Sequence, residues 1–195
     1  MTKALVLLDY QVALAGEGEH VKAPPLAAQA KERGVVDTAA KVLAGARSAG
    51  LLVAHVRLAF EPSYALMTNA HPRFAAYREN KAMLIGSPEA EFVAPLAPRE
   101  DEPIINKGCV DPFVGTALTA LLGSRGITEI IIGGVATHMV VESTARHACD
   151  LGIQVQVVED MCASFDPELH DFSINKMMPS FGVVTSADAV LGELS

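Results

Sequence analysis

The chain has 195 residues, of which 50% are hydrophobic and 19% are charged. This apolar content can fill one substantial core, so we expect a single domain spanning residues 1–195. The net charge of −8 and the lack of any Lys/Arg cluster argue against nucleic acid or anionic membranes as partners. The three cysteines form neither a disulfide framework nor a CxxC motif, and no apolar run approaches the roughly 20 residues of a membrane span. We therefore expect a soluble, cytoplasmic protein.

Six short apolar runs rich in Val, Ile and Leu predict β-strands that alternate with helical segments along the chain. Most of these runs are apolar at successive positions, which is typical of strands that are covered by helices on both faces. The predicted strands are Ala4 to Leu8, Leu51 to Val56, Pro103 to Ile105, Glu129 to Ile132, Gln154 to Val158 and Val183 to Val184.

Five segments between or after these strands have helical periodicity: Val35 to Ala49, Phe113 to Ser124, Met139 to Leu151, Pro167 to Met178 and Ser186 to Leu194. The pairs Asp111-Pro112 and Asp166-Pro167 are typical of an N-cap followed by a first-turn proline. Gly50, Gly126 and Gly152 are expected just past helix ends. Together these patterns predict a doubly wound, three-layer α/β/α sandwich with a central, mostly parallel six-stranded sheet.

Two stretches do not fit this alternation, namely residues 11–31 and 59–98. Long loops in a compact domain commonly form lids, substrate walls or subunit contacts. We expect one of these roles here.

Polar residues follow the predicted strands at three places. Asp9 ends the first strand, Lys107 ends the third, and the turn at residues 134–140 follows the fourth. In open parallel sheets, ligands bind outside the carboxyl ends of the strands. An acid, a base and a strand-to-helix turn are therefore expected to meet at one edge.

These residues belong to three motifs that resemble the isochorismatase-like hydrolase superfamily, and the likeness runs over essentially the whole chain. The first is an aliphatic strand ending in DxQ, at Asp9 and Gln11, and the second is Lys107 followed by F-x-G-T-x-L from Phe113. The third is G-V-x-T-x-x-x-V-x-S-T-A-R, at residues 134–146.

The resemblance implies a mechanism and a place for each of its parts. In this superfamily a cysteine attacks a carbonyl, an aspartate takes the thiol proton, a lysine stabilises charge, and amides after a cis peptide hold the oxyanion. The matching positions here are Asp9, Lys107 and a cis peptide at Val135-Ala136, whereas the position of the cysteine is Val140. A valine cannot form a thioester.

Other members of the superfamily also lack the thiol. Isochorismatases carry a residue that is not a nucleophile there, usually glycine, and a histidine where His138 stands; they cleave a vinyl ether by acid catalysis. The leading hypothesis is therefore a hydrolase of a small carboxylated molecule that uses Asp9 and Lys107, with water as nucleophile. Two alternatives stay open: a binding or assembly protein without catalysis, and an amidohydrolase that uses a displaced Cys109.

Further residues are expected to bind substrate. Gln11, Phe113 and His138 belong to the matched motifs, and Arg57, at the end of the second predicted strand, is placed to bind a carboxylate in bidentate fashion. Nicotinamidases of the superfamily bind zinc through Asp-x-His in the second βα loop, but the segment VRLAFEPSY has neither residue. We expect no metal, no cofactor, a small-molecule substrate and a homo-oligomer, either a dimer or a tetramer.

Overall fold

A computed structural model describes residues 2–195 and contains one six-stranded sheet. The strand order is β3-β2-β1-β4-β5-β6, and every neighbouring pair is parallel. The central strand pairs on both sides, so that Val6 lies opposite Ala54 on one neighbour and Ile132 on the other. The strands are β1 (Lys3–Leu8), β2 (Leu52–Leu58), β3 (Ile104–Lys107), β4 (Glu129–Gly134), β5 (Gln154–Val158) and β6 (Val183–Thr185).

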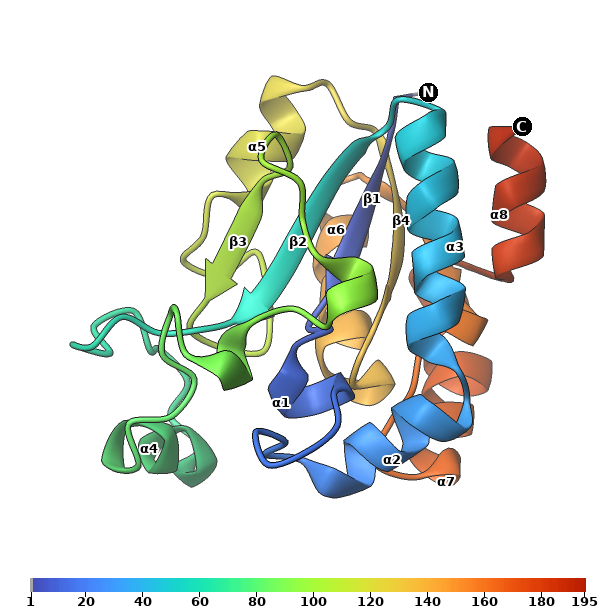
Figure 1. The fold of residues 1–195 in the computed structure, drawn as a ribbon. Helices are drawn as coiled ribbons and strands as arrows, with labels where there is room; N and C mark the ends of the chain where they lie inside the picture. Colours follow the sequence, from blue (N-terminus) through green and yellow to red (C-terminus); the bar gives the residue numbers. More distant parts are fainter. Residues whose placement is uncertain (1) are drawn as a thin grey trace.

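Helices cover both faces of this sheet, with α3 and α8 on one face and α5 and α6 on the other (Figure 1). The helices are α1 (Val12–Ala15), α2 (Pro24–Glu32), α3 (Val35–Ser48), α4 (Pro72–Glu79), α5 (Leu118–Ser124), α6 (Glu142–Asp150), α7 (Pro167–Phe172) and α8 (Ala187–Leu194). Short helical turns lie at η1 (Pro88–Ala90), η2 (Ala94–Leu96), η3 (Thr137–Val141), η4 (Glu159–Met161), η5 (Ser173–Met177) and η6 (Met178–Ser180). The predicted three-layer α/β/α sandwich is confirmed.

Strand β1 shows why its sequence is apolar at every position. Side chains alternate between the two faces of a strand. Val6 and Leu8 pack in the cluster that includes α5 and α6, whereas Leu5 and Leu7 pack in the cluster that includes α3 and α8. Both faces are therefore buried, as expected for a parallel sheet between two helical layers.

The predicted strands, and the helices predicted at Val35 to Ala49 and Ser186 to Leu194, are confirmed to within about two residues. The helix predicted from Met139 to Leu151 is η3 followed by α6, and the one predicted from Pro167 to Met178 is α7 followed by η5.

The helix expected from Phe113 begins only at Leu118. Asp111 does not cap a helix, because its carboxylate accepts a hydrogen bond from the amide of Phe113, only two residues on, at 2.8 Å. Gly115 then has a φ of 68°, which is incompatible with a continuing right-handed helix. By contrast, Asp166 caps α7 as predicted, accepting from the amide of Leu169 at 2.8 Å.

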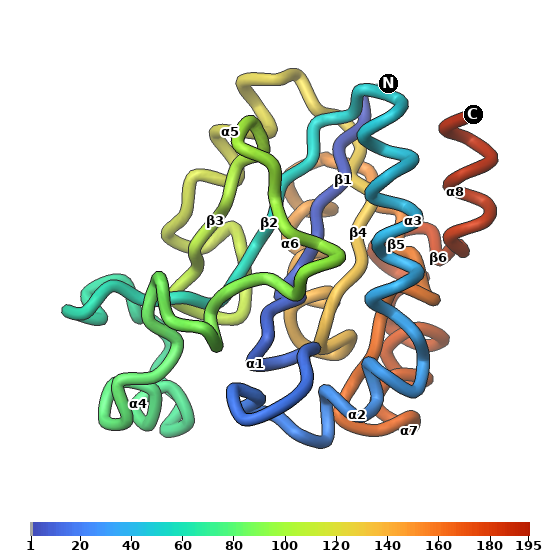
Figure 2. The backbone as a smooth tube through the Cα atoms, viewed as in Figure 1, coloured from blue at the N-terminus to red at the C-terminus, as the bar shows by residue number. Residues whose placement is uncertain are grey.

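The two stretches that did not fit the alternation contain helices that were not predicted. Residues 11–31 include α1 and most of α2, and residues 59–98 include α4, η1 and η2. Figure 2 shows α1, α2 and α4 beyond the carboxyl ends of the central strands, while β1 begins and α8 ends toward the opposite edge. None of the helices within residues 2–195 is long and apolar enough to cross a membrane.

Candidate active site

An acid and a base meet at the carboxyl edge of the sheet. Asp9 follows β1 directly and has a left-handed φ of 60°, which Asp tolerates better than most residues. Lys107 is the last residue of β3, and its side chain reaches past the end of β2 to Asp9. The distance from Lys107 Nζ to Asp9 Oδ2 is 2.9 Å, and both side chains are almost completely buried. The strand ends thus hold one buried ion pair.

The two oxygens of the Asp9 carboxylate differ in their contacts. Oδ2 accepts from Lys107, whereas Oδ1 is buried without a hydrogen-bond partner within residues 2–195. Burial raises the pKa of Asp9, although the Lys107 ammonium and, to a smaller extent, the backbone amide of Leu58 oppose that shift. The Leu58 amide donates its hydrogen bond to Gln11 Oε1, at 2.8 Å, and leaves Asp9 Oδ1 without one. Lys107 is fixed by a second hydrogen bond to the carbonyl of Cys109, at 3.0 Å. Asp9 therefore has a free oxygen that can carry a proton.

The strand-to-helix turn after β4 lies against the end of β1. A side chain at Gly134 would come within 2.3 Å of the Leu8 carbonyl oxygen, so only glycine allows this close approach. The amide of Val135 donates to that carbonyl at 3.1 Å. The peptide bond between Val135 and Ala136 is cis, which is where the resemblance places it. Val140 follows in η3 with 1% of its side chain exposed.

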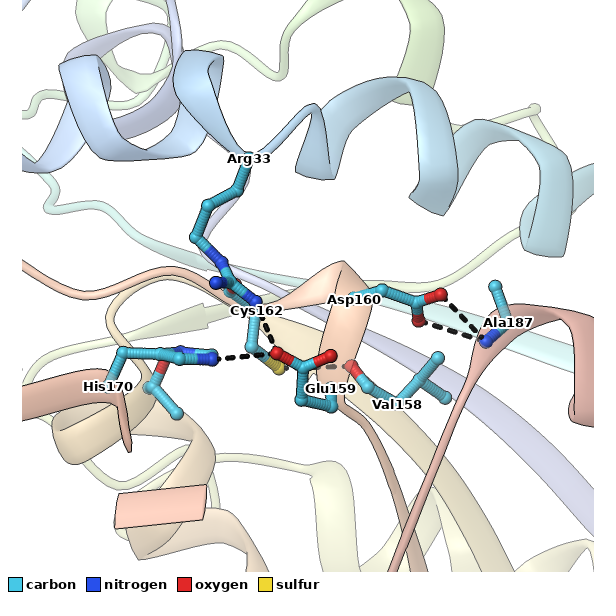
Figure 3. A network of polar contacts seen from close by, with 8 residues as sticks. Arg33, Val158, Glu159, Asp160, Cys162, His170 and Ala187 are labelled. Atoms are coloured by element: carbon cyan, nitrogen blue, oxygen red, sulfur yellow. Dashed lines mark hydrogen bonds and ion pairs between the residues drawn. The ribbon is translucent and has the colours of Figure 1, made fainter. Parts of the chain in front are cut away.

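A polar network adjoins the turn through Thr137, and Figure 3 shows Arg33 and His170 both directed toward the Glu159 carboxylate in this network. The Thr137 hydroxyl lies 2.8 Å from His170 Nδ1, and His170 Nε2 lies 3.0 Å from Glu159 Oε1. Arg33 also contacts Glu159, and its Nε donates to the carbonyl of Cys162 at 2.9 Å. Burial opposes ionisation of Glu159, but the hydrogen bonds from His170 and Arg33 outweigh it and hold the pKa below its ordinary value. Arg33, Glu159 and His170 were not among the predicted site residues, because they are remote in the chain from the matched motifs, whereas Thr137 belongs to the third motif.

The acid, the base and the turn line one cavity of about 320 Å³. Its remaining walls come largely from the two stretches beyond the strand ends, and they are mainly apolar. Three cations and one acid lie among the lining residues, which are Asp9, Leu14, Lys22, Ala23, Pro24, Pro25, Leu26, Leu58, Arg73, Phe74, Tyr77, Lys107, Val110, Val135, Ala136, Met139, Val140 and Phe165. The cavity therefore suits a small molecule with an apolar body and a negative charge.

Two residues expected to bind substrate have their polar groups occupied elsewhere. The Gln11 amide is fully buried and bonds both to the carbonyl and to the amide of Leu58, each at 2.8 Å. Arg57 donates from Nε to Asn106 Oδ1 at 2.8 Å and from Nη1 to the Ala90 carbonyl at 3.2 Å. Neither residue lines the cavity. Both instead connect neighbouring elements through hydrogen bonds.

Phe113 and His138 also lie outside the cavity lining. Phe113 belongs to the core beneath α5 and α6 and packs against the ring of His147, with 4.7 Å between ring centroids. His138 Nδ1 contacts the hydroxyl of Ser164, and burial lowers the pKa of His138. These two side chains help to shape the surroundings of the turn without facing the cavity.

The three cysteines are free thiols, and none lines the cavity. Cys109 is buried, and its Sγ lies 3.3 Å from the carbonyl oxygen of Asp111. Cys162 is also buried, and burial raises its pKa to about 12, so it is a poor nucleophile. Within residues 2–195, no three His, Cys, Asp or Glu side chains are grouped so that they could hold a metal ion.

Known proteins share both this sequence pattern and this architecture. The model of the isochorismatase domain family matches residues 3–189. A maleamate amidohydrolase from Pseudomonas putida is 27% identical over 188 residues, which cover 96% of this chain and 84% of that protein. The isochorismatase family protein YecD from Escherichia coli O157:H7 is 33% identical over 160 residues, covering 82% of this chain and 83% of that one.

The solved structures agree. The crystal structure of an isochorismatase family protein from Desulfovibrio vulgaris superposes with a TM-score of 0.81 at 26% identity, and the alignment covers 99% of this chain and 98% of that one. The family model spans nearly the whole chain, and the six-stranded parallel sheet is the architecture that the resemblance implied. The chain therefore belongs to the isochorismatase family of hydrolases.

Proposed function

We propose that this protein hydrolyses a small carboxylated molecule by acid–base catalysis, with Asp9 as the proton carrier, Lys107 as its counter-charge and water as the nucleophile. The observation that carries the proposal is that Asp9 lines the cavity and that its buried Oδ1 has no hydrogen-bond partner in the described chain, while Oδ2 pairs with Lys107. A carboxyl group whose pKa is raised by burial can hold a proton and deliver it to substrate.

The residues suit a three-step hydrolysis. In the first step, Asp9 donates its proton to the substrate, and the Lys107 ammonium stabilises the carboxylate that remains. In the second step, water adds to the activated carbon and returns a proton to Asp9, which gives a hemiketal from a vinyl ether or a tetrahedral intermediate from an amide. In the third step, Asp9 protonates the leaving oxygen or nitrogen, the bond from that atom to the carbon breaks, and the new hydroxyl group returns its proton to Asp9, so that one water is added in all. An amide needs in addition that the turn at Val135 and Ala136 stabilise the oxygen of the tetrahedral intermediate.

Val140 excludes the thioester route through this position. Its side chain lines the cavity where the resemblance places the reactive thiol, and it has no heteroatom. The name of the Pseudomonas putida relative indicates a substrate with both a carboxylate and an amide. A substrate of that general kind fits the small, cation-rich cavity here, with the reacting end beside Asp9.

The test is turnover of a panel of vinyl ethers, amides, ureas and carbamates by Asp9→Asn and Val140→Ala. We expect Asp9→Asn to lose about 10²- to 10⁴-fold in kcat/KM, since it removes a general acid, and Val140→Ala to stay within a few-fold of the wild type. Thermal unfolding checks that each variant is folded. A folded Asp9→Asn protein with wild-type turnover would refute the proposal. If the wild-type protein binds members of the panel but turns none over, the chain is a binding protein instead.

Val140→Cys provides a second, independent test of the site. Since Val140, Asp9 and the turn at Val135 and Ala136 line one cavity, a thiol at residue 140 would share that cavity with the proposed acid, as a nucleophile and its base must. We expect a burst of product from an amide substrate and rapid alkylation of residue 140, located by mass spectrometry. The same variant carrying Asp9→Asn should lose the burst. A Val140→Cys thiol no more reactive than buried Cys162 would show that the site cannot activate a nucleophile.

A further inference from the structure

We propose that Arg73 and Tyr77 on α4 bind the carboxylate of the substrate and so select for anionic molecules. This inference rests on the proposed function and deepens it, because it assigns the recognition of the substrate's charged end to a helix that none of the sequence motifs includes. Arg73 and Tyr77 are four residues apart, so they share one face of α4, and both line the cavity.

The charge of Arg73 is unmatched by any carboxylate in the described structure. Three cations line the cavity, and two of them have acidic partners: Lys107 lies 2.9 Å from Asp9, and Lys22 lies 3.3 Å from Glu89. Within residues 2–195, the Arg73 guanidinium has no acidic oxygen within ion-pair distance, that is, 4.0 Å. One cation at the cavity is therefore left to pair with a ligand.

The contacts of Arg73 leave its charge without an acidic partner. Its Nη1 lies 3.6 Å from Sδ of Met139, which also lines the cavity, and its guanidinium carbon lies 5.3 Å from the ring centroid of Phe74. A thioether is a weak acceptor, and a ring face leaves the N–H groups at the edge of the guanidinium unsatisfied. The planar fork of donors can therefore take a carboxylate in bidentate fashion.

Tyr77 adds a neutral donor beside this charge. It is partly buried and lines the cavity, and its hydroxyl takes part in none of the side-chain hydrogen bonds within residues 2–195. Burial raises the pKa of Tyr77; the charge of Arg73 opposes the shift and that of Asp9 adds to it, so the ring is within electrostatic reach of both groups. The phenol therefore keeps its proton and can donate to the same carboxylate.

The arrangement also indicates the orientation of the substrate in the cavity. Arg73 is exposed, whereas Asp9 is buried at the strand end, and the lining also includes the apolar side chains of Pro24, Pro25 and Phe165. A ligand that fits has one carboxylate at the solvent side, a short apolar body, and an uncharged reacting group beside Asp9. Cations and ligands without a carboxylate are disfavoured.

The experiment measures binding rather than turnover. Small monocarboxylates, namely maleamate, succinamate and benzoate, are each compared with their methyl esters by NMR titration of the full chain. We expect at least one acid to bind about 10-fold or more tighter than its ester, and Arg73→Gln to weaken that acid by about 10- to 100-fold, since it removes a charge-assisted hydrogen bond. Tyr77→Phe should weaken it about 3- to 10-fold. Neither variant should change the binding of the ester by more than about twofold.

Arg78→Gln is the matched control, because Arg78 is on the same helix, is exposed and does not line the cavity. It removes the same charge and should leave all affinities within about twofold, since exposed charges at a distance are screened. If Arg78→Gln weakens acids as much as Arg73→Gln, or if no acid binds in preference to its ester, the inference is wrong. The binding measurements can contradict the role of Arg73 and Tyr77 while Asp9→Asn still abolishes turnover. The two proposals can therefore be tested separately.

Discussion

One buried acid pairs with a base at the carboxyl ends of the strands, and another does so near their amino ends. The two pairs differ in whether an oxygen of the acid is left without a hydrogen-bond partner. At the carboxyl edge, Asp9 bonds to Lys107 through one oxygen only. Before the amino end of β3, Glu102 accepts from Arg47 through both oxygens, at 2.7 Å each, and Oε2 also lies 2.9 Å from His55 Nε2. The acid near the amino edge is saturated with donors, and the acid at the carboxyl edge is not.

The difference in hydrogen bonding appears as opposite pKa shifts. Burial opposes ionisation of Glu102, but the hydrogen bonds from Arg47, the Arg99 amide and His55 overcome it and lower the pKa to about 2. Burial prevails at Asp9, whose pKa is raised. A fully paired carboxylate stabilises the fold, whereas one with a free oxygen in a cavity is suited to moving a proton.

The largest effect that can test this contrast is expected when the basic partner of each acid is replaced. Lys107→Met should reduce kcat/KM by about 10²- to 10³-fold, because nothing then stabilises the Asp9 carboxylate after proton transfer. The equivalent change at the other edge, Arg47→Met, should leave kcat/KM within a few-fold and should instead reduce stability. Steady-state kinetics and urea denaturation of both variants show whether Lys107→Met mainly reduces activity and Arg47→Met mainly reduces stability. Equal losses of activity in the two variants would contradict it.

A second, smaller effect is expected in the pH dependence of stability. The pKa of Glu102 is lower in the folded chain than its ordinary value of 4.5, so its contribution is present above that value and is lost as the pH falls toward 2. Glu102→Gln should therefore destabilise the protein by about 1–2 kcal/mol at pH 7 and by much less near pH 2. Urea denaturation at the two pH values gives both numbers. A difference that does not change with pH would show that Glu102 is not held ionised.

The smallest effect concerns the network behind the turn. His170→Gln should cost about 1 kcal/mol of stability and reduce kcat severalfold with little change in KM, because Thr137 loses its hydrogen bond beside the cis peptide. The control is His147→Gln, which breaks a comparable contact with Asp111 outside the cavity lining. If both variants lower kcat equally, the network does not position the turn.

The sequence predicted the centre of the site because strand ends and motifs are local patterns. Asp9, Lys107 and the turn at Val135 and Ala136 follow apolar strands directly, and parallel topology alone brings strand ends together. Arg57 shows the limit of that argument. Leu58 lines the cavity, and since side chains alternate along β2, Arg57 points to the other face and pairs with Asn106.

The walls of the cavity could not be predicted in the same way. The sequence of α4, PRFAAYRE, is largely polar and fully buries only Phe74, so it lacks the apolar periodicity that reveals a helix. Its position depends on contacts with remote residues, including Phe60 and Met83, in a small separate core. Which of its side chains face the cavity is decided by this packing, and for that reason Arg73 and Tyr77 were missed.

The role of Asp9 as the proton carrier is tested most directly by titrating the two carboxyl groups in the folded chain by carbon-13 NMR, with Asp9→Asn and Glu102→Gln to assign the signals. We predict that Asp9 titrates above its ordinary value of 3.8 and that Glu102 titrates near 2. An Asp9 carboxyl that titrates at or below 3.8 would rule out this role, because such a group could not hold the proton that the proposed hydrolysis requires.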